Sequence, residues 1–223
     1  MADRGENGFP IHAVMKILRR EYKKWDAPVI TMMSNQGATP FEVLVSTILS
    51  LRTRDEVTGA ASRRLFQKAR TPQEMVRLGE TAIQKLIYPV GFYPTKARRI
   101  IEISKKLISG YHSTVPDDID ELVTFPGVGR KTANLVLVEG YKKPAVCVDT
   151  HVHRISNRMG FVDTRNPDQT EMALRKNLPK KYWIQYNEIL VAFGQTICRP
   201  ISPFCSRCPV RQFCLQKGVM KRR

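Results

Sequence analysis

Hydrophobic residues recur along this chain at the spacing of amphipathic helices. Three segments keep a period of about 3.6 residues: Ile11, Val14, Ile17, Leu18 and Tyr22 in the first, Ile100, Ile103 and Leu107 within 96–108, and Trp183, Tyr186, Ile189, Leu190 and Phe193 within 182–197. The alternation that marks a half-buried strand is not sustained anywhere. The pattern therefore predicts an all-α fold.

Three short motifs predict where further helices begin. Thr39-Pro40-x-Glu42 and Thr71-Pro72-x-Glu74 each combine a capping hydroxyl, a proline in the first turn and a glutamate three residues after the cap. Asn166-Pro167-x-Gln169 is a third start of the same kind. An apolar stripe follows the first motif through 41–49, which predicts a buried helix there, preceded by a loop over 35–39.

Composition narrows the class of protein. The 223 residues are 42% hydrophobic, which is enough for a packed core, and no low-complexity linker separates two domains. A net charge of +17 suits a polyphosphate partner or an anionic membrane surface, and charge alone does not choose between them. No apolar leader precedes Pro10, and the longest near-apolar stretch, Val43–Leu51, is too short to span a bilayer. We expect a soluble intracellular protein, located in the cytoplasm or nucleoid of a prokaryote or in the nucleus or mitochondrion of a eukaryote.

Residues 117–137 predict a helix-hairpin-helix. One helix leads to the turn Phe125-Pro126-Gly127-Val128-Gly129, and a second helix runs through 131–137. The glycines permit a tight turn and let backbone N–H groups approach a phosphate, while the second helix directs its positive N-terminus at the anion. Such a hairpin would hold the DNA backbone without reading sequence. An ordinary αα-hairpin with a glycine turn is the alternative.

Two residues near the hairpin are candidates for catalysis. Lys131 lies beside Arg130 in the first turn of the second helix. The positive charge of Arg130 and the positive end of the helix dipole both disfavour the ammonium form of Lys131. An unprotonated amine is what a Schiff-base nucleophile requires, although a phosphate-binding lysine is the simpler alternative. Asp149 precedes another helix, so it can be an N-cap, and its carboxylate could also stabilise positive charge that develops on a sugar.

Four cysteines near the C-terminus predict a metal centre. The spacing Cys198-x6-Cys205-x2-Cys208-x5-Cys214 lets four thiolates converge on one soft-metal site, with zinc as the competitor of an iron-sulfur cluster. Cys147, between two valines, is expected to be a small buried hydrophobe. His151 and His153 are two residues apart on a helix, so we expect them to form local hydrogen bonds and not a metal pair.

Together the hairpin, the Val148-Asp149-Thr150-His151 segment and the cysteine spacing resemble endonuclease III, the bifunctional DNA glycosylases of the helix-hairpin-helix superfamily. The resemblance runs from about residue 39 to residue 214. It implies a six-helix barrel over 28–142, a discontinuous iron-sulfur domain formed by 1–27 and 143–223, and a substrate groove between them. It also implies a 4Fe-4S cluster held by the four cysteines. The implied partner is double-stranded DNA with damaged bases or abasic sites, bound by a monomer.

The resemblance also assigns roles to individual residues. It makes Lys131 the nucleophile that attacks the deoxyribose C1′, and Asp149 the carboxylate that supports cleavage and later proton transfers. The implied activity is removal of oxidised pyrimidines such as thymine glycol, followed by β-elimination at the abasic sugar. The expected DNA contacts come from the hairpin and two loops: Gly127, Val128, Gly129, Arg130, Thr132, Arg52 and Phe92.

Two of these positions depart from the family pattern. Arg52 and Phe92 stand where glutamine and leucine are usual. Arginine can donate to a guanine edge, so a mismatch-directed thymine or uracil DNA glycosylase is an alternative function. Phe92 can act as an apolar wedge, or it can be a core aromatic in a glycine turn. A non-enzymatic iron-sulfur DNA-binding module is a further alternative.

Charged residues surround the cysteines. Arg199, Arg207, Arg211 and Lys217 interleave with them, so a metal that folds this loop would hold their charges against phosphates. The run 217–223 is expected to be a solvated tail.

Overall fold

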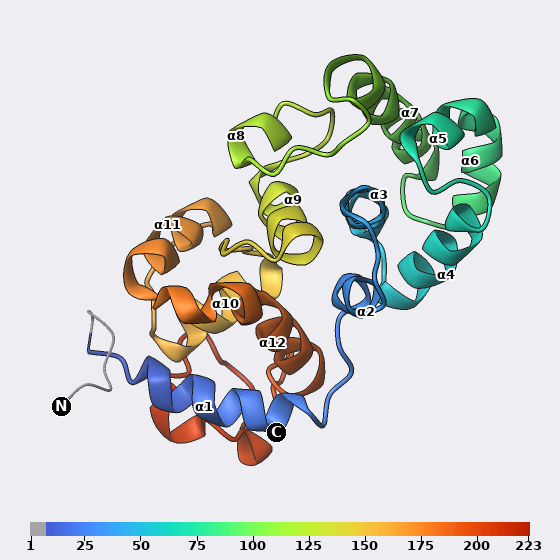
Figure 1. Ribbon diagram of the computed structural model, residues 1–223. Coiled ribbons are helices and arrows are strands. Elements are labelled where there is room, and N and C mark those ends of the chain that lie inside the picture. Colours follow the sequence, from blue (N-terminus) through green and yellow to red (C-terminus); the bar gives the residue numbers. More distant parts are fainter. Residues whose placement is uncertain (1–7) are drawn as a thin grey trace. The chain divides into compact units, whose positions relative to one another are not determined.

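The computed structural model describes residues 8–223 and is helical throughout its regular parts (Figure 1). Helices make up 62% and the described residues include no strand, so the predicted all-α fold is confirmed. The chain forms two compact units. The central unit is Val29–Lys143, and the terminal unit combines residues 8–28 with Pro144–Arg223. The first seven residues of the predicted 1–27 segment lie outside the described residues.

The central unit is built around one buried helix. Its elements are α2 (Val29–Asn35), α3 (Pro40–Ser50), α4 (Asp55–Phe66), α5 (Pro72–Leu78), α6 (Glu80–Ile87), α7 (Tyr93–Gly110), α8 (Ile119–Leu122), α9 (Arg130–Leu135) and a π-helical turn, Val136–Gly140. Every residue of α3 from Phe41 to Leu49 is buried, because α2, α4, α7, α9 and the π-helical turn surround it. Helix α7 packs against α5 and α6.

Two predicted helix starts in the central unit form complete capping boxes. Thr39 Oγ1 accepts a hydrogen bond from the Glu42 backbone N–H at 3.2 Å, and Glu42 Oε2 accepts one from the Thr39 N–H at 2.8 Å. Thr71 and Glu74 repeat this exchange at the start of α5. Two of the otherwise unpartnered amide groups are thereby satisfied at each helix end.

The terminal unit joins the two ends of the described chain. Its helices are α1 (Ile11–Tyr22), α10 (Thr150–Met159), α11 (Pro167–Asn177) and α12 (Trp183–Thr196), with 3₁₀ turns at Lys180–Tyr182, Cys205–Arg207 and Arg211–Phe213. The apolar stripe of α1 shares one core with α10, α11 and α12. Figure 1 shows α1, in blue, next to α12, with which it is in contact.

The structure adds three helices that the hydrophobic pattern did not predict, α2, α4 and α6. Helix α4 buries Thr58, Gly59, Ala61, Ser62 and Leu65, so its core face carries one large apolar residue among small ones and gives little hydrophobic signal. Helix α2 has seven residues and α6 has eight, both too short for the period to repeat more than twice. Helix α7 begins at Tyr93, three residues before the predicted start.

The predicted tail over 217–223 is solvent-exposed at every residue except the half-buried Val219, but its two ends are held by contacts with the rest of the terminal unit. The Lys217 ammonium forms an ion pair with Asp163 at 3.1 Å, although both side chains are exposed. The last residue is held more firmly, since Arg223 N–H donates to Pro203 O at 2.8 Å and its carbonyl oxygen accepts from Ser206 N–H at 3.0 Å. The exposed C-terminal residue is therefore anchored to the cysteine-rich segment through its backbone.

Candidate functional site

The hairpin turn is held by its own backbone. Asp118 Oδ1 caps α8 by accepting from the Asp120 and Glu121 N–H groups at 2.8 and 3.1 Å. In the turn, Val128 N–H donates to Phe125 O at 3.1 Å, and Gly127 adopts a φ of +77°. A Cβ at Gly127 would also lie 2.7 Å from Arg99 Cδ. Glycine is thus required here by conformation.

The second hairpin glycine has a different role. Gly129 is extended, with a φ of −94°, and a Cβ there would meet nothing within 4 Å. No intramolecular constraint therefore requires glycine at this position. The open, exposed backbone at Gly129 agrees with the predicted close approach of a phosphate.

The residues of the turn and of the first turn of α9 differ in their exposure to solvent. Gly127, Gly129 and Arg130 are exposed and Lys131 is half-buried, whereas the Val128 and Thr132 side chains are buried in the core. Of the predicted hairpin contacts, Val128 and Thr132 can therefore offer DNA only their backbone. Helix α9 continues into the π-helical turn, which buries Val136, Leu137 and Val138 behind Lys131.

Asp149 caps a helix in the terminal unit. It precedes α10, and its Oδ1 accepts from Val152 N–H at 2.8 Å. The predicted N-cap role is therefore present, on a half-buried carboxylate. Lys131 belongs to the central unit and Asp149 to the terminal unit.

Arg52 and Phe92, far apart in sequence, lie next to each other in the central unit. The Arg52 guanidinium carbon is 5.7 Å from the centre of the Phe92 ring. Both residues have left-handed backbones, with φ values of 53° and 56°. The Phe92 side chain is 62% exposed, so the interpretation of Phe92 as a core aromatic is wrong. Its exposure leaves the ring available as a wedge.

Four of the five cysteines come together. Cys198, Cys205, Cys208 and Cys214 line one cavity in the terminal unit, and Cys147 is buried elsewhere as predicted. Burial raises the pKa of the Cys208 thiol to about 12, and the other three cysteines add to the shift. No group of three or more His, Cys, Asp or Glu side chains within residues 8–223 has the arrangement of a site for a metal ion.

Donors already point at two of the sulfur atoms. The buried Arg158 guanidinium donates to Cys198 Sγ at 3.4 Å, and Gln216 N–H donates to Cys214 Sγ at 3.4 Å. Hydrogen bonds of this kind stabilise a thiolate, which is the ligand form of cysteine. The donor set is therefore four clustered thiols with polar support, which have the ligand chemistry of a thiophilic metal group, although within residues 8–223 they are not arranged around a metal position.

The arginines of the cysteine-rich segment gather around one aromatic ring. The guanidinium carbons of Arg199, Arg207 and Arg223 lie 5.2, 4.4 and 4.2 Å from the centre of the Phe204 ring. Sequence reasoning found the first two and missed Arg223. Phe204, next to Cys205, is the only local signal that could have indicated a common platform for these charges.

The two histidines form local hydrogen bonds, as predicted. His153 Nδ1 lies 2.7 Å from Thr170 Oγ1, and His151 Nδ1 lies 3.2 Å from Arg154 Nη2. Neither belongs to a group arranged to hold a metal ion in the described part of the chain. No helix over residues 8–223 is both long and apolar enough to cross a membrane, and the cellular location stays a prediction.

Comparison with known proteins identifies the family. Residues 45–180 match the model of the HhH-GPD superfamily of base excision DNA repair proteins. The chain is 53% identical to endonuclease III of Thermotoga maritima over 181 residues, which cover 81% of this chain and 85% of that protein. It is 36% identical to endonuclease III of Bacillus subtilis over 192 residues, 83% and 88% of the two chains.

Solved structures agree with this relationship. An endonuclease III in a non-covalent complex with DNA superimposes with a TM-score of 0.83 at 33% identity, covering 92% of this chain and 94% of that one. A thermostable thymine-DNA glycosylase gives a TM-score of 0.72 at 22% identity, which shows a shared fold alone.

These matches settle the class of protein. Endonuclease III enzymes are DNA glycosylases with AP lyase activity, so the alternative of a non-enzymatic DNA-binding module is wrong. The solved neighbours include endonuclease III structures in complexes with DNA. The chain belongs to the endonuclease III family of base excision DNA repair enzymes, as the sequence motifs predicted.

Proposed function

We propose that the enzyme excises oxidised or ring-saturated pyrimidines from duplex DNA and then cuts the strand through a Schiff base on Lys131. The observation that carries this proposal is the position of Lys131, half-buried in the first turn of α9 directly after the exposed Gly127–Gly129 turn. An amine there lies beside backbone that a DNA phosphate can approach. A relative of 33% identity has been solved as a trapped covalent intermediate with DNA.

The proposed chemistry begins at the sugar. The unprotonated Lys131 Nζ attacks C1′, the C1′–N bond to the base breaks, and the departing base takes a proton. Ring opening gives an imine between Nζ and C1′, with O4′ protonated. The imine acidifies the C2′ hydrogen. Loss of that proton expels the 3′ phosphate by β-elimination, and water later releases Lys131.

Asp149 has two tasks in this scheme. Its Oδ1 caps α10, which fixes the carboxyl group at the helix N-terminus. The carboxylate then stabilises positive charge that develops on the sugar and helps to move protons. Asparagine at this position would keep the cap and remove the charge, so the two tasks are separable.

DNA binding is divided between the hairpin and the two loops. We assign phosphate contacts to exposed Gly127, Gly129 and Arg130, with Val128 and Thr132 restricted to backbone contributions. A lesion nucleotide must leave the stack before C1′ can be attacked. Exposed Phe92 and the adjacent Arg52 are the residues we assign to the space that it vacates.

We assign a 4Fe-4S cluster to four cysteines of the terminal unit, Cys198, Cys205, Cys208 and Cys214. We assign the six-helix barrel to the central unit, and we propose that the enzyme is a monomer. The four thiols line one cavity and receive hydrogen bonds from Arg158 and the Gln216 backbone, which supports a thiolate-bound group. These four cysteines would hold the cluster, which when bound would cross-link the segment around it. The Arg199, Arg207 and Arg223 side chains around Phe204 then face phosphates.

Borohydride trapping tests the nucleophile. Wild-type enzyme should form a covalent complex with abasic-site DNA, and Lys131→Ala should form none. Lys105→Ala removes an exposed lysine from the same unit and should trap as wild type does. Undiminished trapping by Lys131→Ala would show that another amine performs the chemistry. Asp149→Asn should retain folding and lose base excision; full excision would leave Asp149 as a cap only.

Arg52 favours a second candidate, a mismatch-directed thymine or uracil DNA glycosylase. Its guanidinium lies beside the exposed Phe92 ring and can donate two hydrogen bonds to guanine O6 and N7. Single-turnover excision of thymine opposite guanine, compared with thymine glycol opposite adenine, separates the candidates. Faster thymine excision would favour the second, and Arg52→Gln should then reduce it.

A further inference from the structure

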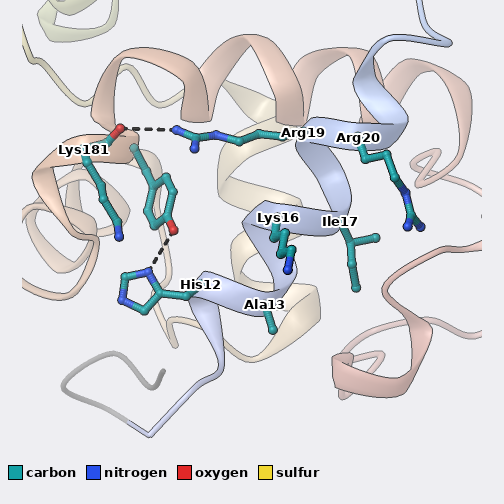
Figure 2. A pocket seen from close by; sticks show the side chains of 8 residues that line it. His12, Ala13, Lys16, Ile17, Arg19, Arg20 and Lys181 are labelled. Carbon is teal, nitrogen blue, oxygen red and sulfur yellow. Dashed lines mark hydrogen bonds between the residues drawn. The ribbon is translucent and has the colours of Figure 1, made fainter. Parts of the chain in front are cut away.

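A basic pocket lies in the terminal unit, in segments that neither the hairpin nor the cysteines occupy. The cavity of about 860 Å³ lies between α1 and the Lys180–Tyr182 turn (Figure 2). Among residues 8–223, no Asp or Glu lines it. Its polar lining is His12, Lys16, Arg19, Arg20, Lys181 and Tyr182.

Tyr182 organises the cations of this pocket. Its hydroxyl is 2.8 Å from His12 Nδ1. The Arg19 guanidinium carbon and the Lys181 ammonium nitrogen lie 4.8 and 5.2 Å from the centre of its ring. Arg19 Nη2 also donates to Lys181 O at 3.5 Å, as Figure 2 shows. These cations are thus held near one another by cation–π contacts and hydrogen bonds.

The charges in the pocket are only partly neutralised. Arg20 pairs with Glu21 at 3.3 Å, while Lys16, Arg19 and Lys181 form no ion pair with any residue of the described chain. Like charges gathered on one concave surface repel each other, and an anion bound between them would relieve that repulsion. Arginine presents a fork that matches phosphate oxygens.

We propose that this pocket binds backbone phosphates of duplex DNA, as a contact site additional to the hairpin. DNA is the partner in the proposed function, and the Tyr182 ring is buried and covered by cations, so it offers no face on which a free nucleotide base could stack. Such a contact would be independent of sequence and of damage, because it reads only phosphates. It would hold the enzyme on undamaged DNA.

Salt-dependent binding to undamaged duplex tests this site. The double variant Lys16→Ala/Arg19→Ala should bind more weakly than wild type. The slope of its log K against log salt concentration should be less steep than that of wild type by about 2. The control variant Lys68→Ala/Lys105→Ala removes the same charge from exposed positions of the central unit. Its slope of log K against log salt concentration should change less. Trapping of abasic-site DNA at saturating enzyme should be unchanged in both.

Two outcomes would overturn the proposal. Equal slopes for the pocket and control variants would mean that the pocket acts only through net charge. The second outcome is a pocket variant that loses affinity for tripolyphosphate or for a polyglutamate peptide while keeping its affinity for duplex. The pocket would then serve a free polyphosphate or an acidic protein partner.

A second inference concerns a buried lysine in the central unit. The Lys96 side chain is buried at the start of α7, with the residue 4% exposed. Its ammonium donates to Leu49 O at 2.8 Å, to Leu51 O at 2.5 Å and to Thr53 Oγ1 at 3.1 Å. All three acceptors belong to the end of α3 and the loop that contains Arg52.

The same network reaches the turn that contains Phe92. Thr53 Oγ1 also accepts from Gly91 N–H at 3.2 Å, and a Cβ at Gly91 would lie 2.8 Å from Arg52 O. The two loops are therefore in contact through their backbones. Arg52 and Phe92 both have φ values that non-glycine residues rarely adopt, so the surroundings must hold them there.

We infer that Lys96 is a positioning residue, which sets the backbones of Arg52 and Phe92 before DNA binds. The inference rests on the proposed function, in which those two side chains enter the space that the extruded nucleotide vacates. A loop fixed in its bound conformation loses less freedom on binding, and its side chains meet the duplex in one geometry. The three hydrogen bonds of one amine supply that restraint.

Lys96→Met tests the restraint, because it keeps the length of the side chain and removes all three donors. We expect KM for thymine glycol DNA to rise roughly tenfold and the ratio of excision opposite adenine and opposite guanine to change, with kcat for abasic-site cleavage near wild type. Thr53→Val should shift both quantities in the same direction by less. Ser104→Ala removes a buried hydroxyl bonded to Ile100 O in the same helix and should shift neither.

Unchanged KM and opposite-base ratio in folded Lys96→Met would overturn the positioning role. If Lys96→Met lost abasic-site cleavage in proportion to excision, the residue would be merely structural, and Thr53→Val would then leave the ratio unchanged. Absence of trapping by the wild-type enzyme would instead contradict the proposed function itself, so the two failures are distinguishable.

Discussion

The hairpin of the central unit presents Arg130 to solvent and the cysteine-rich segment of the terminal unit presents several arginines, but the two regions are ordered by different means. The hairpin is fixed by local chain geometry, with a side-chain cap at Asp118, a positive φ at Gly127 and a buried Val128. The segment after Cys198 has only two 3₁₀ turns of three residues each. Its conformation depends on contacts between residues distant in the segment, such as Arg223 with Pro203, and on contacts from outside it.

Arg158 of α10 supplies many of those contacts. Its guanidinium donates to Arg199 O at 2.9 Å and to Pro200 O at 3.1 Å, and its own carbonyl accepts from Lys217 N–H at 3.0 Å. Carbonyl groups that a helix would satisfy internally are satisfied here by one buried side chain. A surface of exposed arginine can thus be ordered locally, by the residues of its own turn, or from a distance, by hydrogen bonds from a buried side chain such as Arg158.

Loss of one thiol should have the largest effect, and it should affect the cysteine-rich segment while leaving the hairpin intact. Cys208→Ser removes one ligand of the proposed cluster, so the segment loses its metal cross-links and the terminal unit becomes less stable. We expect loss of absorbance in the blue-violet range and rapid proteolysis after Cys198, with a protected hairpin. Limited proteolysis with mass spectrometry measures this. Equal protection of the segment in both proteins would mean that Arg158 and the tail suffice to order it.

Gly127→Ala should have the next largest effect, in the hairpin. Alanine at a φ of +77° costs about 1–2 kcal/mol, and the new Cβ must also displace the Arg99 side chain. Gly129→Ala is the matched control, since its φ of −94° accepts alanine and its surroundings are open. Chemical denaturation should show destabilisation by the first change alone. Gly129→Ala should weaken DNA binding if a phosphate approaches there.

The helix starts of the central unit were predictable because they depend on nearby residues. Thr39 and Glu42 lie three apart and satisfy each other, so the motif alone specifies the contact. Clustering of the four thiols also followed from spacing. By contrast, Arg223 is distant in sequence from Phe204, and Arg52 is distant from Phe92, so no sequence spacing predicts that these pairs meet. The small-residue face of α4 escaped for want of hydrophobic contrast.

Removal of a capping hydroxyl should have a smaller effect than the glycine change. Thr39→Ala leaves the Glu42 N–H without its side-chain acceptor and should cost about 1 kcal/mol of unfolding free energy. Thr39→Ser keeps the acceptor and should restore most of it. Denaturant midpoints at constant m-value would measure both. A loss in Thr39→Ala near zero would show that burial of α3, and not its cap, determines where this helix begins.

The smallest expected effect is a pH dependence that arises in the central unit. Burial, and to a lesser extent the neighbouring Arg99 charge, lowers the pKa of Lys96 from 10.5 to about 8. Between these values the unfolded chain binds more protons at this site than the folded one does, so the free energy of unfolding rises as pH increases from 8 towards 10.5. Below pH 8 both states are protonated and the contribution is constant.

The difference between wild type and Lys96→Met isolates this contribution, because all other titrating groups are shared. Thermal melts of both proteins over this pH range should show wild type gaining stability relative to the variant. Hydrogen bonding opposes the lowering of the Lys96 pKa by burial. Leu49 O, Leu51 O and Thr53 Oγ1 all accept from the amine, so they favour its protonated form with three donors. A pH-independent difference would therefore mean that hydrogen bonding outweighs burial at Lys96. The loop containing Arg52 would then be held by a permanently charged amine, a cross-link of the same kind as the Arg158 guanidinium in the terminal unit.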